Sequence, residues 1–236
     1  MIGLPPVNAF VLHRTPYRES SSLVRLFVPG QGQLVATWRG TAALHLYQPY
    51  HIDWQASGDW VTIRSVDLAG KVLRLKGQAL YLALYLNELL GVLLPRWVPA
   101  EALFGTYYAT LRRLESGESA EPLLRFFERR LLEQLGFGID FERDRAGELL
   151  QPERHYRFDD QNAFLQDPSS IVVDGFHGQD LIHIAHNDYG SPSTRRAAKQ
   201  LFRRALALQL GERELLSRRF LQPLVSPSHS SGTPNT

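Results

Sequence analysis

Residues 9–40, AFVLHRTPYRESSSLVRLFVPGQGQLVATWRG, decide the fold of the chain. Apolar runs at residues 9–13, 23–28 and 33–39 predict three short strands in succession. The Pro-Gly-Gln-Gly sequence at 29–32 predicts a tight turn between the last two, because glycine readily adopts positive φ. We therefore expect antiparallel strands at the start of the chain.

Two further runs, at residues 48–56 and 60–68, extend this β-rich part and flank a Ser-Gly-Asp turn at 57–59. Five short strands without a helix long enough to cover a sheet favour a small closed barrel. Their combined length is typical of an OB-fold, although an SH3-like barrel would give a similar pattern.

The period of the apolar residues changes at residue 78. Residues 78–94, 99–116 and 120–135 have helical spacing and are followed by Pro95, Gly117 and Gly136, so we expect a helical bundle. Further on, residues 156–165 predict a small hairpin, residues 178–186 a short helix and residues 191–210 a long one. The predicted class is α+β, with an OB-fold domain at 1–77, a mostly helical C-terminal domain at 78–222 that contains the hairpin, and a disordered tail at 223–236.

The net charge of the 236 residues is only +2, but the charges are unevenly distributed. Residues 1–80 carry 8 basic and 4 acidic side chains, residues 81–190 carry 10 and 18, and residues 191–236 carry 8 and 2. Most of the basic residues are arginines, which suit phosphate and carboxylate recognition. Two basic ends around an acidic middle indicate a polyanion that contacts both ends, although chance also segregates charges.

Two groups of side chains are candidates for this contact. Basic and aromatic residues around the first three strands could hold phosphates and stack on bases. The helix at 191–210 places four cations opposite its apolar face, and we expect them to extend the same track. Solvated arginines on an ordinary barrel and on an ordinary helix are the alternative. The candidate DNA-binding residues are Arg14, Tyr17, Arg18, Arg25, Trp38, Arg39, Arg195, Arg196, Lys199 and Arg203.

The helix at 120–135 combines arginines with phenylalanines. Its cations could clamp the carboxylate of a bound peptide while an apolar side chain of the peptide fills a groove. Pairing with Glu128 and Glu133 on the same helix is an equally good interpretation. The candidate peptide-binding residues are Arg125, Phe126, Arg129 and Arg130.

Motifs of common enzymes are missing from the sequence. It contains no G-x-x-x-x-G-K-[ST], no H-E-x-x-H and no G-x-S-x-G, and without cysteine it has no thiol nucleophile, disulfide or thiolate metal site. His183, His186 and Asp180 lack a further strong ligand, so a packed histidine is favoured over zinc. We expect no catalytic activity, no cofactor and no metal. No apolar run is long enough to span a membrane and no secretory signal is recognisable, which predicts a cytoplasmic protein.

The chain resembles the RecO family of bacterial recombination mediators in DNA repair. The resemblance covers about residues 5–222 in order. It is carried by the stretch at 9–40, by LYLNELLGVLL at 84–94, by LLRFFERRLLEQLGFGIDF at 123–141 and by STRRAAKQLFRRAL at 193–206.

The resemblance implies an OB-fold followed by a helical domain, and binding of single- and double-stranded DNA. It also implies annealing of complementary strands, and help in placing the RecA recombinase on DNA coated by single-stranded DNA-binding protein. RecR is an implied partner, the nucleoid in the cytoplasm is the implied location, and no turnover site is implied. Members bind the acidic C-terminal tail of single-stranded DNA-binding protein, which suits the groove at Arg125 and Arg129. A protein-interaction adaptor that recognises acidic tails without binding DNA is the alternative.

Two departures from the family pattern matter. Some members bind zinc through four cysteines after the third helix, and this sequence has none, so zinc should be absent. Many members carry several basic residues in the loop after the third strand, whereas residues 41–50 offer only His45. The basic helix near residue 200 should therefore carry a larger share of the DNA contact.

Overall fold

The computed structural model of the protein describes residues 7–58, 60–168 and 175–221. The tail expected at 223–236, and Asp59 of the expected turn, lie outside these residues. In chain order the elements are β1 (Val7–Tyr17), β2 (Ser21–Val28), the single 3₁₀ turn η1 (Pro29–Gln31), β3 (Gly32–Trp38), β4 (Pro49–Ser57), β5 (Trp60–Leu68), α1 (Gln78–Leu93), α2 (Glu101–Glu115), α3 (Ala120–Gln134), β6 (His155–Phe158), β7 (Phe164–Asp167), β8 (Phe176–His177), α4 (Gly178–Ala185), α5 (Pro192–Leu210) and α6 (Arg218–Leu221).

The first five strands close into a barrel in the order β1-β2-β3-β5-β4. Neighbouring strands are antiparallel except β3 and β5, which pair in parallel at Ala36–Val61 and Thr37–Thr62. Successive side chains of a strand point to opposite faces, so alternate apolar residues fill the interior, among them Val24, Leu26 and Ile52. This architecture confirms the predicted α+β class with an OB-like barrel.

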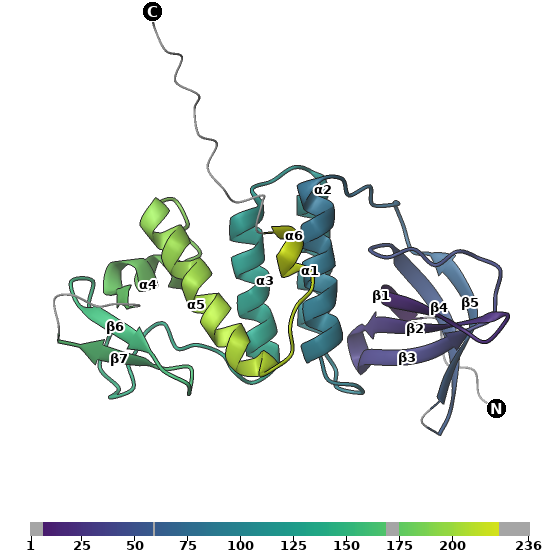
Figure 1. Ribbon diagram of the computed structural model, residues 1–236, viewed down its shortest axis with the longest axis horizontal. Helices are drawn as coiled ribbons and strands as arrows, with labels where there is room; N and C mark the ends of the chain where they lie inside the picture. Colours follow the sequence, from purple (N-terminus) through teal and green to yellow (C-terminus); the bar gives the residue numbers. More distant parts are fainter. Residues whose placement is uncertain (1–6, 59, 169–174, 222–236) are drawn as a thin grey trace, which may run out of the picture.

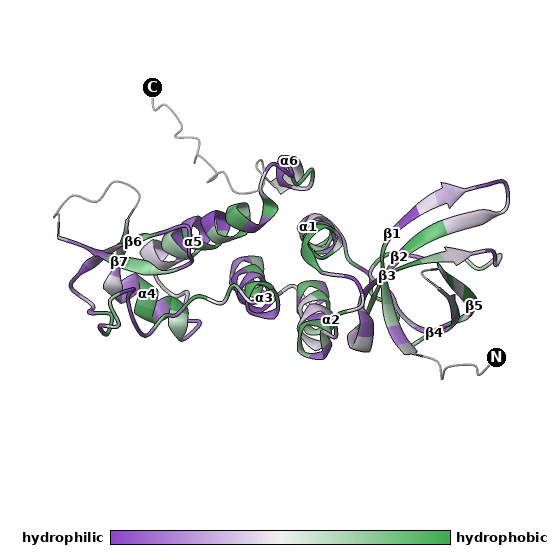
Figure 2. Ribbon diagram, turned by 90° about the horizontal axis from the view of Figure 1, so that it is seen from below, coloured by the Kyte–Doolittle hydropathy of each residue, from purple (hydrophilic) through white to green (hydrophobic). Residues whose placement is uncertain are grey.

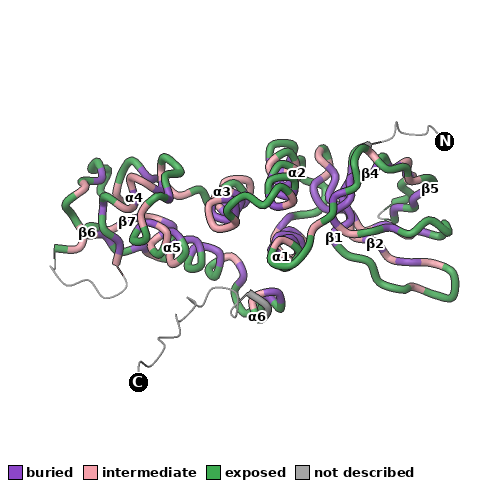
Figure 3. Tube along the Cα trace, turned by 90° about the horizontal axis from the view of Figure 1, so that it is seen from above, coloured by how far each residue is buried: buried purple, intermediate pink, exposed green. Residues whose placement is uncertain are grey.

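The barrel packs against the helices through a second set of apolar side chains on its outer surface. Phe10 and Phe27 belong to the helical core, and both rings contact Phe104 and Tyr107 of α2. The pairing of β1 with β2 shifts register between Val11 and His13, which leaves Leu12 as an extra residue, and its side chain joins the same core. The buried parts of the trace accordingly meet where β1 faces α1 and α2 (Figure 3).

Helices α1, α2 and α3 lie side by side between the barrel and the rest of the molecule, as the views in Figures 1 and 2 agree. Helix α5 packs on α3 and α4, and one apolar core continues from Phe10 in the barrel to Phe202 in α5. The three predicted helices of the bundle are confirmed. None of the helices among the described residues has both the length and the apolar character that a membrane span needs.

A second, small sheet lies beyond α5 and has the order β7-β6-β8. The sequence predicts β6 and β7 but not β8, because two residues carry no detectable period. Gly178 begins α4 directly after β8, and a Cβ at this position would lie 1.9 Å from the carbonyl oxygen of Gln151. Only glycine therefore allows the chain to pass so close to the segment that precedes β6.

Candidate nucleic-acid interface

The exposed face of α5 carries three of the predicted cations along about two turns. The helix begins with a capped end, since Ser191 Oγ accepts a hydrogen bond from the Thr194 amide at 3.1 Å, and Pro192 follows in the first turn. Ala198, Leu201 and Ala205 are buried against the core, which turns the other face of the helix to solvent. The three predicted cations that are exposed, hereafter the α5 cations, are Arg196, Lys199 and Arg203, and Arg204 is exposed beside them.

These cations line one wall of a groove between α5 and the small sheet. The opposite wall includes Arg157 of β6, while Arg204 of α5 donates to the carbonyl oxygen of Phe158 at 3.0 Å and joins the two walls. Arg157 also pairs with Asp167 at 2.9 Å across β6 and β7. Five basic side chains thus surround a groove that Leu165 and Ala207 line with apolar surface.

The groove contains one carboxylate among its described lining residues, Asp159, and that group is already neutralised. Its Oδ2 accepts from Arg145 Nη1 at 2.6 Å, and its Oδ1 accepts from the amides of Gln161 and Ala163. Burial alone would raise the pKa of Asp159, but the two amides and the Arg145 guanidinium outweigh it and hold the pKa below its usual range. Within the described part of the chain, no carboxylate forms an ion pair with the α5 cations.

Arg195 does not belong to the groove, contrary to the sequence-based prediction. Its Nη1 donates to the carbonyl oxygens of Tyr189 and Gly190 at 2.9 and 2.8 Å, and its Nε lies 3.9 Å from Glu121. The side chain thus ties the start of α5 to the preceding turn and to α3. In its place the structure adds Arg204, which helical spacing from Arg196 could have indicated, and Arg157, which no pattern within α5 could reveal.

At the other end of the molecule, the β1–β2 hairpin projects from the barrel into solvent (Figures 1 and 3). Arg14 Nε donates to Ser22 Oγ at 3.0 Å, and Ser22 pairs with Trp38, the neighbour of Arg39. Arg18 lies at the hairpin tip with a φ of 55°, and its guanidinium is 5.1 Å from the centre of the Tyr17 ring. The three exposed arginines, hereafter the hairpin cations, are Arg14, Arg18 and Arg39.

Two predicted barrel contacts must be corrected. Trp38 is only 6% exposed in the barrel core and its indole Nε1 donates to the carbonyl oxygen of Ala42 at 3.1 Å, so the ring is not available to stack on a base. Arg25 faces α1 instead of solvent, and its Nη1 donates to the carbonyl oxygen of Gly91 at 2.8 Å. Alternation along the strands determined both orientations, but the sequence did not show that α1 covers the Arg25 side of the barrel.

The predicted peptide clamp on α3 consists largely of pairs within that helix. Arg125 is 7% exposed and its Nη1 lies 2.9 Å from Glu128 Oε2, while Tyr85 of α1 donates to Glu128 Oε1 at 2.7 Å. Burial raises the pKa of Glu128, and the charge of Arg125 opposes that effect. Arg125 therefore cannot reach a surface ligand, and the alternative of pairing along the helix describes it correctly.

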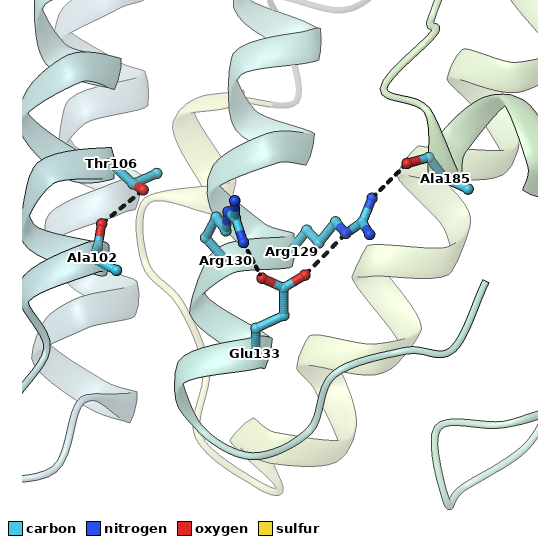
Figure 4. A network of polar contacts seen from close by, with 6 residues as sticks. All are labelled: Ala102, Thr106, Arg129, Arg130, Glu133 and Ala185. Carbon is cyan, nitrogen blue, oxygen red and sulfur yellow. Dashed lines mark hydrogen bonds and ion pairs between the residues drawn. The ribbon is translucent and has the colours of Figure 1, made fainter. Parts of the chain in front are cut away.

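Figure 4 shows that Arg129 and Arg130 share one carboxylate. Arg129 Nε is 3.1 Å from Glu133 Oε1 and Arg130 Nη1 is 2.8 Å from Glu133 Oε2. Arg129 also donates to the carbonyl oxygen of Ala185 at the end of α4, at 2.9 Å. Only Arg130 remains largely exposed, and its guanidinium lies 5.4 Å from the ring centre of Phe126.

The sequence predicts one continuous basic track. In the structure, the two basic regions do not form such a track. Figure 1 places the barrel and its hairpin at one end of the long axis and the small sheet with the start of α5 at the other. Helices α1, α2 and α3 lie between them. The cations near residue 200 and those around the hairpin are therefore separate surfaces.

Comparisons with known proteins identify the family. Residues 74–219 match the model described as "Recombination protein O C terminal". The chain is 41% identical to the DNA repair protein RecO of Pseudomonas aeruginosa strain LESB58 over 214 residues, which cover 89% of this chain and 91% of the relative. It is also 41% identical to the DNA repair protein RecO of Stutzerimonas stutzeri, over 92% of this chain and 93% of the relative. The identity to the DNA repair protein RecO of Methylococcus capsulatus is 35%, over 89% of this chain and 90% of the relative.

An OB-like barrel joined to a helical domain, together with these matches, defines a recombination protein of DNA repair. The chain belongs to the RecO family.

Proposed function

We propose that the protein binds single- and double-stranded DNA, anneals complementary strands and helps to load RecA onto DNA coated by single-stranded DNA-binding protein. Its membership in a family of DNA repair proteins supports this role. RecR is the proposed partner protein, and the nucleoid in the cytoplasm is the proposed place of action. The barrel at 1–77 and the helical part at 78–222 would act as the two domains of this mediator.

The groove beside α5 is the observation that carries the proposal. It brings the α5 cations together with Arg157 and Arg204, while its one described carboxylate is neutralised by Arg145. The α5 cations form no ion pair among the described residues, so they can attract phosphates and release the counterions condensed on nucleic acid, which favours binding entropically. Arginine suits this task because its planar guanidinium can contact two phosphate oxygens at once.

Annealing would follow from the same charge neutralisation. Two complementary strands repel each other through their phosphates, and a bound cationic surface reduces that repulsion at the distances where bases begin to pair. No covalent step is needed, so the protein would accelerate pairing without a turnover site.

A salt titration tests the DNA-binding proposal directly. We expect the affinity for a fluorescent oligonucleotide to fall with salt by about 0.7–0.9 log units per phosphate contact for each log unit of salt. Reversing the three α5 cations, R196E/K199E/R203E, should lower the affinity and the slope together. An affinity that does not depend on salt, or that is unchanged in this variant, would overturn the DNA-binding proposal.

The alternative function, an adaptor for acidic peptide tails, has one observation in its favour. Leu165 and Ala207 place apolar surface beside the cations of the groove, which would also suit an acidic peptide that ends in an apolar residue. On α3, only Arg130 and the partly exposed Phe126 are left for such a peptide. An annealing assay with short complementary strands separates the two functions, because an adaptor would bind the peptide but would not accelerate pairing.

A further inference from the structure

The hairpin cations and the α5 cations differ in position but share one property: both groups are exposed and, among the described residues, neither forms an ion pair with a carboxylate. Helix α5 begins near α4, far from the barrel, and runs back toward α3 (Figure 1). The α5 cations occupy its first two-thirds, so they lie on the side of the helical layer opposite the hairpin.

In the layer between these two regions, four of the five arginines of α2 and α3 form ion pairs, and the exception is the exposed Arg112. Examples of these pairs are Arg113–Glu118 at 2.8 Å and Arg129–Glu133 at 3.1 Å. In the segment after α5, Arg219 pairs with Glu214 at 3.4 Å. Arg213 donates to the carbonyl oxygens of Val92, Gln209 and Leu210.

The last turn of α1 accepts hydrogen bonds both from the barrel and from the segment after α5. From the barrel, Arg25 donates to Gly91, and Gln33 Nε2 donates to the carbonyl oxygens of Leu90 and Gly91 at 3.1 Å each. From the C-terminal side, Arg213 Nη1 donates to the carbonyl oxygen of Val92 at 3.0 Å. Helix α1 thus connects the barrel with the segment after α5, and the two basic regions lie on opposite sides of the helical layer.

We infer that one molecule holds two separate nucleic-acid segments at once, one at the hairpin cations and one in the α5 groove. This inference rests on the proposed DNA binding and specifies how its surface is divided. A nucleic-acid strand bound at one end of the protein is thereby held close to a strand bound at the other end. Pairing between the two then starts from a high effective concentration instead of a free encounter in solution.

The number of rigid duplexes bound per protein chain tests this division. A duplex of about 12 base pairs is far shorter than the persistence length of roughly 150 base pairs, so it cannot bend around the helical layer. Native mass spectrometry at low salt, with two unrelated duplexes of different mass, counts the duplexes on each chain and reports the oligomeric state of the protein. We expect two duplexes per chain, with mixed complexes that contain one of each.

Three matched double charge reversals then locate the segments. K199E/R203E should leave one duplex per chain, bound at the hairpin, and R18E/R39E should leave one, bound in the α5 groove. R112E/R113E changes the charge of α2 by the same amount outside both regions and should keep two. Thermal unfolding of each variant confirms that the fold persists.

Each alternative outcome has a distinct meaning. One duplex per wild-type chain, lost entirely in either end variant, would show a single composite site and overturn the inference while leaving DNA binding intact. Two duplexes that persist in both end variants would place the segments elsewhere and overturn it as well. No binding of any duplex or single strand by the wild-type chain would instead refute the proposed function.

Discussion

Asn87 of α1 donates a hydrogen bond from Nδ2 to the carbonyl oxygen of Leu12, at 3.1 Å, at the point where β1 bulges toward the helices. The bulge removes Leu12 from the regular ladder with β2, so its carbonyl oxygen needs a partner from outside the sheet. Asn87 Oδ1 in turn accepts from the hydroxyl of Tyr107. This buried chain of polar groups fixes the barrel on the helices.

Replacing Asn87 with alanine should therefore destabilise the protein. The change leaves the Leu12 carbonyl and the Tyr107 hydroxyl without their partner in a buried place, which costs about 1–3 kcal/mol per unsatisfied group. Urea unfolding measures the difference, and Y107F, which retains the bond to Leu12, should cost less. Equal stability of N87A and the wild-type protein would show that the bond contributes nothing.

The buried pair Arg125–Glu128 should show strong coupling in a double-mutant cycle. E128L alone leaves an uncompensated buried guanidinium, which costs roughly 3–5 kcal/mol, whereas the double variant R125M/E128L removes both charges and should recover much of the loss. The free energies of unfolding of the four proteins give the coupling. Additive effects of the two changes would contradict a direct interaction.

Gly32 should tolerate alanine worse than Gly211, although their backbone angles are nearly the same. Gly32 has φ 62° and ψ −120°, and Gly211 has φ 58° and ψ −128°. A Cβ at Gly32 would lie 2.3 Å from the carbonyl oxygen of Val98, whereas a Cβ at Gly211 meets open space. Because the backbone strain is common to both, G32A should be the less stable variant by about 1–3 kcal/mol in chemical denaturation. Equal losses would mean that the loop at Val98 simply moves away.

Asp159 should make the stability of the wild-type protein depend on pH. Its pKa is lower in the folded chain than its ordinary value of 3.8, so the ionised carboxylate stabilises the fold above that value and the contribution is lost as the pH falls through the folded pKa. The difference in unfolding free energy between wild type and D159N should thus be largest near neutral pH and shrink in acid. D160N, at the exposed neighbouring position, is the control for removing one negative charge from the same turn.

Single residues of the groove should be distinguishable by their salt dependence. K199A and R203A should each reduce the slope of log affinity against log salt by about 0.7–0.9, because each removes one proposed phosphate contact. R195A, on the same helix, should leave the slope unchanged, since its guanidinium is already bonded to Tyr189 and Gly190. A reduced slope in R195A, or an unchanged slope in the other two, would contradict this assignment of the groove.

Much of the architecture could be predicted because it depends on local periods. The strands at 23–28 and 60–68 have a clear apolar pattern, and the helix at 120–135 has apolar residues at helical spacing. The strand β8 escaped prediction because two residues are too few to show a period. The arc of cations on α5 was also visible, since helical spacing alone separates Lys199 and Arg203 from the buried Leu201.

The sequence by itself determined the longer strands and helices, their order and the main apolar face of each helix, because these follow from the spacing of side chains along one strand or one helix. The tertiary structure alone decided which faces meet. It turned Arg25 toward Gly91, buried Trp38 and Arg125, and brought Arg157 from β6 to the cations of α5. It also placed a layer of helices between the two basic regions. This separation depends on long-range packing, which no local pattern encodes.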